Sequence, residues 1–174
     1  MDILSHGLWG GIAFGRANRR SFGLAFSFGI VPDLVPFGPF HLSVLLGLAQ
    51  RPHFGSEPPD PSLFPDYVHR AYSVTHSLVI FLVAFALLWM VFRKPIWESC
   101  AWGLHILFDI FTHSFRFFPT PFLWPISDFK VNSLHWGRPE IFIPNVVLLV
   151  LLYAWFLYRQ RRIRKGPTEV FFRR

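Results

Sequence analysis

The chain has 174 residues, 52% of them hydrophobic, and its mean hydropathy is +0.38. Its 22 phenylalanines and 7 tryptophans exceed what a soluble domain of this length can bury, so the composition excludes an ordinary soluble protein. It predicts one integral membrane domain. A single cysteine, Cys100, excludes an internal disulfide and a cysteine-based zinc cluster.

The net charge of +7 comes from basic residues gathered at particular places. Most of the lysines and arginines lie in three groups, each directly after an apolar segment: Arg16–Arg20, Arg93–Lys94 and the tail Arg159–Arg174. This distribution is typical of the cytoplasmic ends of membrane helices. It indicates membrane lipids with anionic headgroups as the partner, and no nucleic acid. We expect a membrane domain over 1–158 and a basic cytoplasmic tail over 159–174.

The first hydrophobic segments are short. Residues 3–15 are predicted to descend from the outside to Arg16, and residues 21–31 to rise again to a turn at Pro32–Asp33. At about 1.5 Å per residue they reach only about 15 to 20 Å, less than the ~30 Å of a bilayer core. We therefore expect a hairpin that does not fully cross, followed by an interfacial or re-entrant segment at 40–50. The first residues include an acid and no basic run, which disfavours a cleaved signal peptide.

Three longer segments follow. Residues 70–92 are predicted to descend, 96–115 to rise and 141–158 to descend, because the basic groups fix their cytoplasmic ends. Residues 51–68 and 115–140 then form outer loops rich in proline and aromatics. The predicted fold is an all-α, polytopic helical membrane protein with about five hydrophobic segments, the first two short. Its N-terminus is expected outside and its C-terminus in the cytoplasm.

The stretch WGLHILFDIFTHS, residues 102–114, carries polar side chains within an apolar segment. His105, Asp109, Thr112 and His113 recur at i, i+4, i+7 and i+8 and so share one face of a helix. An aspartate at mid-membrane costs about 2.5 to 3.5 kcal/mol, which the apolar neighbours offset. The stripe has two interpretations. It is a hydrogen-bonded contact between helices, or it is a functional site in which histidine and aspartate bind one cation.

The stretch HRAYSVTHS, residues 69–77, places His69 and His76 two helical turns apart, on one face near the outer end of a descending helix. Arg70 stands beside them and suits a phosphate or carboxylate partner. The alternative is a polar helix cap at the water interface.

Two further acidic residues are predicted at the outer side. Asp2 and His6 repeat the i, i+4 pairing, although an aspartate at a helix start is common without a ligand. Asp33 lies between two prolines, where turn chemistry is the alternative. Four segments, each with an acid, a histidine or both, are thus expected to converge on the outer half of the membrane.

The order of these motifs resembles the YdjM-like family of membrane-bound, metal-dependent hydrolases, which are regulated by LexA in some bacteria. The shared pattern is D-x-x-x-H at residues 2–6, the PD pair at 32–33, the HR-x-x-x-x-THS stretch and the H-x-x-x-D helix followed by threonine, and it extends to about residue 127. The resemblance implies a metal-dependent hydrolase in the inner membrane. The chain departs from the family at Val35, where a second acid is common, and in its proline-rich insert around 51–65.

The predicted metal ligands are imidazoles and carboxylates: Asp2, His6, Asp33, His69, His76, His105, Asp109 and His113. This donor set suits Zn²⁺ or a pair of divalent ions, and the absence of thiolates disfavours copper(I). The predicted catalytic residues are Arg70, Ser77 and Thr112. Arg70 would clamp an anionic lipid ester or phosphoester, and Ser77, Thr112 and Ser114 would hydrogen-bond around the metal.

Other hydrolase classes are excluded by missing motifs. The chain has no G-x-S-x-G elbow and no PSGH stretch, so neither a serine hydrolase nor a phosphatase with a nucleophilic histidine fits. Two functions remain open: a metal-dependent hydrolase of a lipid or lipid-linked ester or phosphoester, and a non-enzymatic divalent-cation carrier or sensor. Ligands gathered toward one face favour the enzyme, because a carrier holds its site near the midplane between repeats.

Overall fold

The computed structural model describes residues 1–53 and 58–164. Six α-helices follow one another: α1 (Ile3–Phe14), α2 (Arg19–Leu45), α3 (Asp66–Thr75), α4 (Leu78–Phe92), α5 (Cys100–Thr112) and α6 (Pro139–Arg164). Two short 3₁₀ helices, η1 (Pro61–Leu63) and η2 (Trp97–Ser99), precede α3 and α5. The described residues contain no β-strand, and the predicted all-α class is confirmed. The parts of the expected outer loop at 54–57 and of the basic tail at 165–174 lie outside the described residues.

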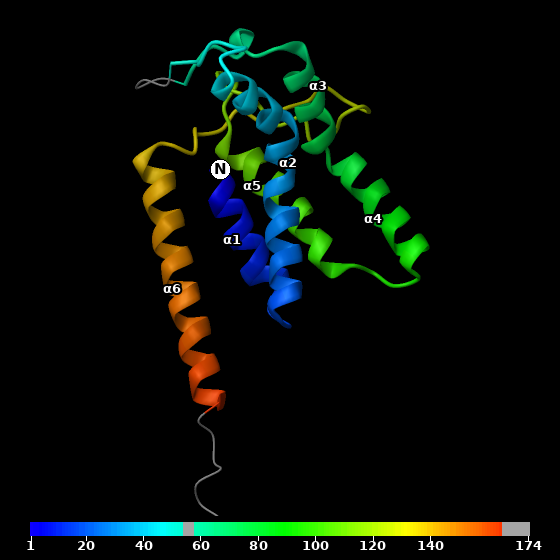
Figure 1. The fold of residues 1–174 in the computed structure, drawn as a ribbon, viewed down its shortest axis with the longest axis vertical. Helices are drawn as coiled ribbons and strands as arrows, with labels where there is room; N and C mark the ends of the chain where they lie inside the picture. The colour runs from blue at the N-terminus through cyan, green and yellow to red at the C-terminus, as the bar shows by residue number, and fades with distance from the viewer. Residues whose placement is uncertain (54–57, 165–174) are drawn as a thin grey trace, which may run out of the picture.

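The helices run alternately down and up between two ends of the molecule (Figure 1). At the centre, α1, α2 and α5 pack against one another. On one side α6 packs against α1, and on the other α4 packs against α5. The loop from α2 to α3 and the loop from α5 to α6 gather at the upper end, above this central group. The start of α1, the end of α3 and the end of α5 meet beside the middle of α2.

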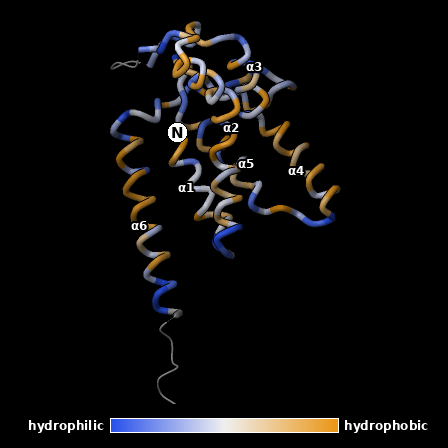
Figure 2. Tube along the Cα trace, in the orientation of Figure 1, coloured by the Kyte–Doolittle hydropathy of each residue, from blue (hydrophilic) through white to orange (hydrophobic). Residues whose placement is uncertain are grey.

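The three basic groups share the opposite end of the molecule. In Figure 2 the hydrophilic colour marks the turn between α1 and α2, the link between α4 and α5, and the last turns of α6, all at the lower end. The intervening lengths of α4 and α6 are strongly hydrophobic. Basic residues at one end and apolar helices above them are the arrangement that the charge pattern predicts. That this end faces the cytoplasm stays a prediction.

The segment 19–45 differs from its prediction. Instead of a short helix, a turn at Pro32–Asp33 and a separate interfacial segment, it forms a single helix of 27 residues. Proline normally disrupts a helix interior, because it lacks an N–H and crowds the preceding turn. Here Pro32 and Pro36 are fully buried and lie in one stripe with Ala25, Gly29 and Phe40. Packing of this stripe against the neighbouring helices outweighs the local cost of the prolines, so α2 continues.

The segment 70–92 is also different from its prediction, since it is broken rather than continuous. α3 ends at Thr75, α4 begins at Leu78, and the two helices are bent by 60°. Ser77 caps the new helix by accepting the Ile80 N–H, and the Leu78 N–H donates to the carbonyl of Phe122. His76 stands at the break, in neither helix.

Two helices, α2 and α6, are long and apolar enough to cross a membrane, or three if the bent pair of α3 and α4 counts as one span. The expected count of about five hydrophobic segments is therefore not confirmed. α1 and α5 have 12 and 13 residues and so reach about 20 Å, short of a ~30 Å core. α6 continues through the expected domain boundary at residue 158 to Arg164.

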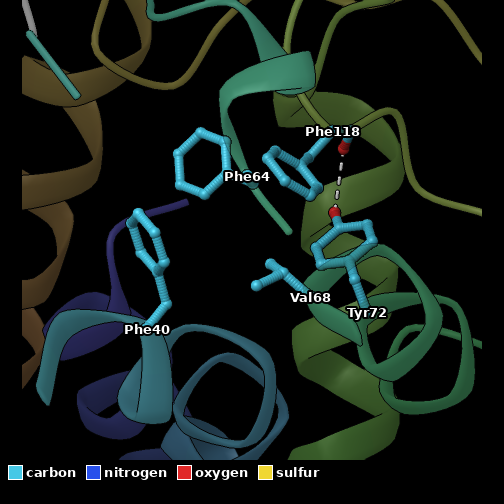
Figure 3. Packing of buried hydrophobic residues seen from close by; sticks show 5 residues of the cluster. All are labelled: Phe40, Phe64, Val68, Tyr72 and Phe118. Atoms are coloured by element: carbon cyan, nitrogen blue, oxygen red, sulfur yellow. Dashed lines mark hydrogen bonds between the residues drawn. The ribbon is translucent and has the colours of Figure 1, made fainter. Parts of the chain in front are cut away.

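A cluster of hydrophobic side chains, most of them aromatic, closes the upper end (Figure 3). It consists of Phe40, Phe64, Val68, Tyr72 and Phe118, which come from α2, the loop before α3, α3 and the loop after α5. The Tyr72 hydroxyl donates to the carbonyl of Phe118 at 2.9 Å. The cluster ties α2 and α3 to the loop that follows α5. It thereby fixes the elements that carry the polar residues below it.

Candidate metal centre

The polar stripe of α5 faces the centre of the molecule. His105 and Asp109 are buried there, with 1% and 0% of their surfaces exposed, although their helix lies in an apolar protein. Thr112 is the last residue of α5 and His113 caps it. The stripe meets α1, α2 and the end of α3, and each of these elements brings its own polar side chain.

Four residues meet at this junction: Asp33 from α2, His76 from the end of α3, and His105 and Asp109 from α5. One ligand atom of each lies within 4.8 Å of the other three. His105 Nε2 lies 3.2 Å from Asp109 Oδ2 and 3.0 Å from His76 Nε2. His76 Nε2 lies 3.5 Å from Asp109 Oδ2 and 3.4 Å from Asp33 Oδ1. Ligand atoms around a tetrahedral ion with bonds near 2.1 Å are about 3.4 Å apart, so the spacing suits a metal ion.

Backbone carbonyls fix how both imidazoles point. His105 Nδ1 donates to the carbonyl of Gly29 at 2.7 Å, and His76 Nδ1 donates to that of Tyr72 at 3.2 Å. Since a carbonyl only accepts, a proton is on Nδ1, and in the neutral imidazole Nε2 then presents a lone pair. This is the second-shell arrangement that orients metal-binding histidines.

Three features of this junction call for a positive charge at its centre. The two Nε2 atoms are only 3.0 Å apart, and in neutral imidazoles their lone pairs would repel each other. Two carboxylates stand beside them. Asp109 Oδ2 is buried and has no hydrogen-bond partner within residues 1–53 and 58–164. Buried polar atoms are rarely left unpaired, so a cation bound among the four residues explains all three features.

The other oxygen of Asp109 contacts a second set of groups. The Met1 α-amino group donates to Oδ1, and His6 Nε2 donates to it at 2.9 Å. The Thr112 hydroxyl also points at Oδ1, at 3.4 Å, and His113 Nε2 lies 3.6 Å away. The ring of His6 stacks on His105, with centroids 3.6 Å apart. These contacts hold the Asp109 carboxylate in one orientation, with Oδ2 directed at His76 and His105.

His113 is held in the same way as the two histidines of the four-residue group. Its Nδ1 donates to the carbonyl of Phe118 at 2.8 Å and lies 2.9 Å from the Tyr72 hydroxyl. Tyr72 also stacks on His76, with centroids 3.7 Å apart. Tyr72 thus positions the imidazoles of His113 and His76, a role that the sequence pattern did not reveal. Its place four residues before His76 is the signal that could have found it.

Several predicted site residues lie elsewhere. Asp2 caps α1 by accepting from the Ser5 N–H and hydroxyl. Ser77 caps α4 and donates to the Trp124 carbonyl, and Ser114 lies in the loop after His113. These side chains hold the fold around the four-residue group and do not enter it.

His69 and Arg70 are also placed away from the four-residue group. His69 Nε2 bonds to the Pro61 carbonyl at 3.0 Å, and its ring stacks on Phe118. Because α3 ends at Thr75, the predicted common face of His69 and His76 does not form. Arg70 is exposed and has no hydrogen bond or ion pair with any part of the chain that the structure describes. Val35, where the family pattern has an acid, is 47% exposed on α2 and does not take part in the group.

A cavity of about 980 Å³ lies beside the loop that follows His113. It is lined by Pro58 and by parts of 114–117 and 132–139, which include Arg116, Arg138, Phe115 and Trp136. Its walls are tied to the end of α5, because the Trp136 N–H donates to the Thr112 carbonyl and the Ser133 N–H to the His113 carbonyl. None of the four residues of the metal centre lines this cavity.

The fold and this junction define a class of protein: an all-helical membrane protein with a largely buried group of two histidines and two aspartates that could hold a metal ion. Within that class the chain belongs to the YdjM inner membrane protein family, whose sequence model matches residues 1–172. No curated protein and no solved structure matches the chain. The family resemblance seen in the motifs is confirmed, and family and apolar helices together support membrane association.

Proposed function

We propose that the protein is a metal-dependent hydrolase whose divalent ion, Zn²⁺, is held by Asp33, His76, His105 and Asp109. The observation that carries the proposal is the spacing of the four ligand atoms, with both Nε2 lone pairs directed inward by carbonyl-bound Nδ1 atoms. Zinc suits a compact set of nitrogen and oxygen donors at these separations, and no thiolate is present among them. A bound divalent ion supplies a Lewis acid and lowers the pKa of a coordinated water.

The residues around the ligands have their own parts. His6 donates to Asp109 Oδ1 and stacks on His105, so it holds two ligands at once. Thr112 approaches the same oxygen, as a hydrogen-bond partner of the carboxylate. Tyr72 supports His76 through its ring and backbone carbonyl. Locked side chains of this kind keep a site in its productive geometry.

The substrate we propose is an amphiphile with an anionic ester or phosphoester group. The cavity beside the loop after His113 combines arginines with aromatic walls, so it suits a charged group joined to an apolar body. Arg138 lines it, whereas Arg70 is exposed on α3. We therefore assign to Arg138 the substrate contact that the sequence suggested for Arg70. A lipid or lipid-linked substrate would reach this end of the protein from the outer half of the bilayer.

Metal content tests the first part of the proposal. Detergent-purified wild type should contain about one zinc ion in the four-residue group, and His105→Ala should lose it. His41→Ala is the matched control, because His41 is exposed and its Nδ1 bonds only to the Phe37 carbonyl. Equal zinc in all three proteins would refute the metal centre and leave the polar junction as a packing contact.

Turnover tests the second part. Proteoliposomes would be assayed for hydrolysis of fluorogenic phosphoesters and carboxylic esters, and the same vesicles for zinc flux. Hydrolysis that is lost on chelation and restored by zinc supports the enzyme. Zinc flux without hydrolysis would support the carrier, the other function that a buried cation site in a membrane permits.

A further inference from the structure

A small pocket at the basic end of the molecule lies far along the helices from the metal centre. It has a volume of about 240 Å³ and is lined by Arg16, Trp155, Phe156, Arg159 and Gln160. We call it the basic pocket. Arg16 follows the end of α1, and the other four residues belong to the lower part of α6.

The two helices that form the pocket are fixed side by side above it. Trp9 Nε1 donates to the Asn145 side chain at 2.7 Å, and Asn145 in turn donates to the Ser5 hydroxyl at 2.8 Å. Lower down, the Tyr153 hydroxyl donates to the Leu8 carbonyl at 2.8 Å. Since α1 ends at Phe14 while α6 continues to Arg164, the space beside the lower part of α6 stays open.

Among the residues that the structure describes, no acidic group offsets the charge of the basic pocket. It contains two arginines and no acidic residue. Within residues 1–53 and 58–164, neither Arg16 nor Arg159 forms an ion pair, and the contact found for Arg159 is with the ring of Trp155, at 5.6 Å. Stacking on an aromatic ring leaves the in-plane N–H groups of a guanidinium available to an oxyanion.

The face of α6 above the pocket is apolar and uncovered by protein. Leu148, Leu151 and Trp155 are 51%, 60% and 50% exposed, and their spacing puts them on one side of the helix. From Ile141 to Arg159 the helix rises about 27 Å, close to the ~30 Å of a hydrocarbon core. Arg159 therefore lies where the acyl chains of a bilayer give way to the headgroups.

We propose that an anionic phospholipid binds here, with its phosphate on the exposed Arg16 and Arg159 guanidinium groups at the edge of the basic pocket and its acyl chains along this face of α6. Two guanidinium groups match the phosphate oxygens in charge and geometry, and the apolar face matches the chains. The occupant differs from a lipid held by charge alone, because it is seated at the edge of a defined pocket between α1 and α6. This inference is independent of the proposed hydrolase.

Native mass spectrometry of the full chain in detergent tests it, with phosphatidylglycerol and phosphatidylcholine of identical acyl chains as probes. Wild type should prefer phosphatidylglycerol by roughly 30-fold, each arginine contributing about fivefold. R16Q/R159Q should reduce the preference to about twofold or less. R93Q/K94Q is the matched control, because it removes the same charge from the same end of the molecule but outside the pocket, and it should keep most of the preference.

Three results would overturn the proposal. The first is an unchanged preference in R16Q/R159Q. The second is an equal loss in R93Q/K94Q, which would mean a diffuse attraction to the basic end. The third is a preference seen only in a dimeric species, which would assign the pocket to a second copy of the chain. Thermal unfolding without lipid shows whether each variant is folded, and if the double variant is not, R16Q and R159Q alone should each lose about fivefold.

Discussion

At Gly29, α2 approaches the backbone of α1 closely, and the Gly29 carbonyl accepts a hydrogen bond from His105 Nδ1. A β-carbon at this position would lie 2.5 Å from the carbonyl oxygen of His6 and 3.0 Å from the Cα of Gly7. Both neighbours are backbone atoms, which no side-chain rotation can move. Gly29→Ala therefore forces the two helices apart.

The size of the effect follows from these distances. To bring the new contact from 2.5 Å to an ordinary 3.4 Å, α1 and α2 must separate by close to 0.9 Å. α1 carries His6, and α2 carries Asp33 one turn beyond Gly29. Metal–ligand distances tolerate only about 0.2 Å, and disturbed second-shell contacts typically cost 10- to 100-fold in metal affinity. Overpacking of this kind also destabilises a protein by about 1 to 3 kcal/mol.

We expect Gly29→Ala to weaken zinc binding by about 10- to 100-fold, measured by competition with a chromophoric chelator. The Tm of the metal-free protein in detergent should fall by roughly 2 to 12 °C. Gly23→Ala is the matched control: it lies in the same helix, and no atom lies within 4 Å of its new β-carbon. It should keep the affinity and not lower Tm, because alanine favours a helix. Wild-type zinc affinity and Tm in Gly29→Ala would refute the reasoning, and so would equal losses in Gly23→Ala.

Three further predictions follow from the placement of single residues. His105→Ala should abolish zinc binding while His69→Ala retains it, because His69 bonds to a backbone carbonyl outside the four-residue group. Zinc content is measured by mass spectrometry. Loss of zinc in His69→Ala but not in His105→Ala would restore the prediction that His69 and His76 share one helical face. Arg138→Gln should raise KM for an anionic ester by about tenfold and leave zinc content unchanged, because a lost charged hydrogen bond costs about 1.5 to 3 kcal/mol; an unchanged KM would remove the cavity from the substrate path. In a Cys100→Ser background, a cysteine at Ser62 should react with an impermeant maleimide in intact cells and one at Arg161 should not, and labelling at Arg161 would invert the proposed topology.

Much of this protein is determined by local features of its sequence. Composition and the lengths of the apolar runs require helices in a membrane, since backbone groups in lipid must be hydrogen-bonded within a helix. The basic groups at Arg16–Arg20 and Arg93–Lys94 set the alternating directions of the helices. His105 and Asp109 were correctly placed together because both belong to one uninterrupted helix, whose 3.6-residue period fixes their common face.

Only the tertiary structure decided which residues join His105 and Asp109 in the metal centre. Whether α2 continues past Pro32 depends on the burial of that proline against other helices, and this carries Asp33 into the centre as a helical residue. Whether His76 or His69 joins it depends on where α3 ends, which the Ser77 cap and contacts from the loop after α5 determine. Periodicity places residues only within one element. Which side chains of different elements meet is set by long-range packing, because contacts such as those of Gly29 with His6 and His105 join segments far apart in the chain.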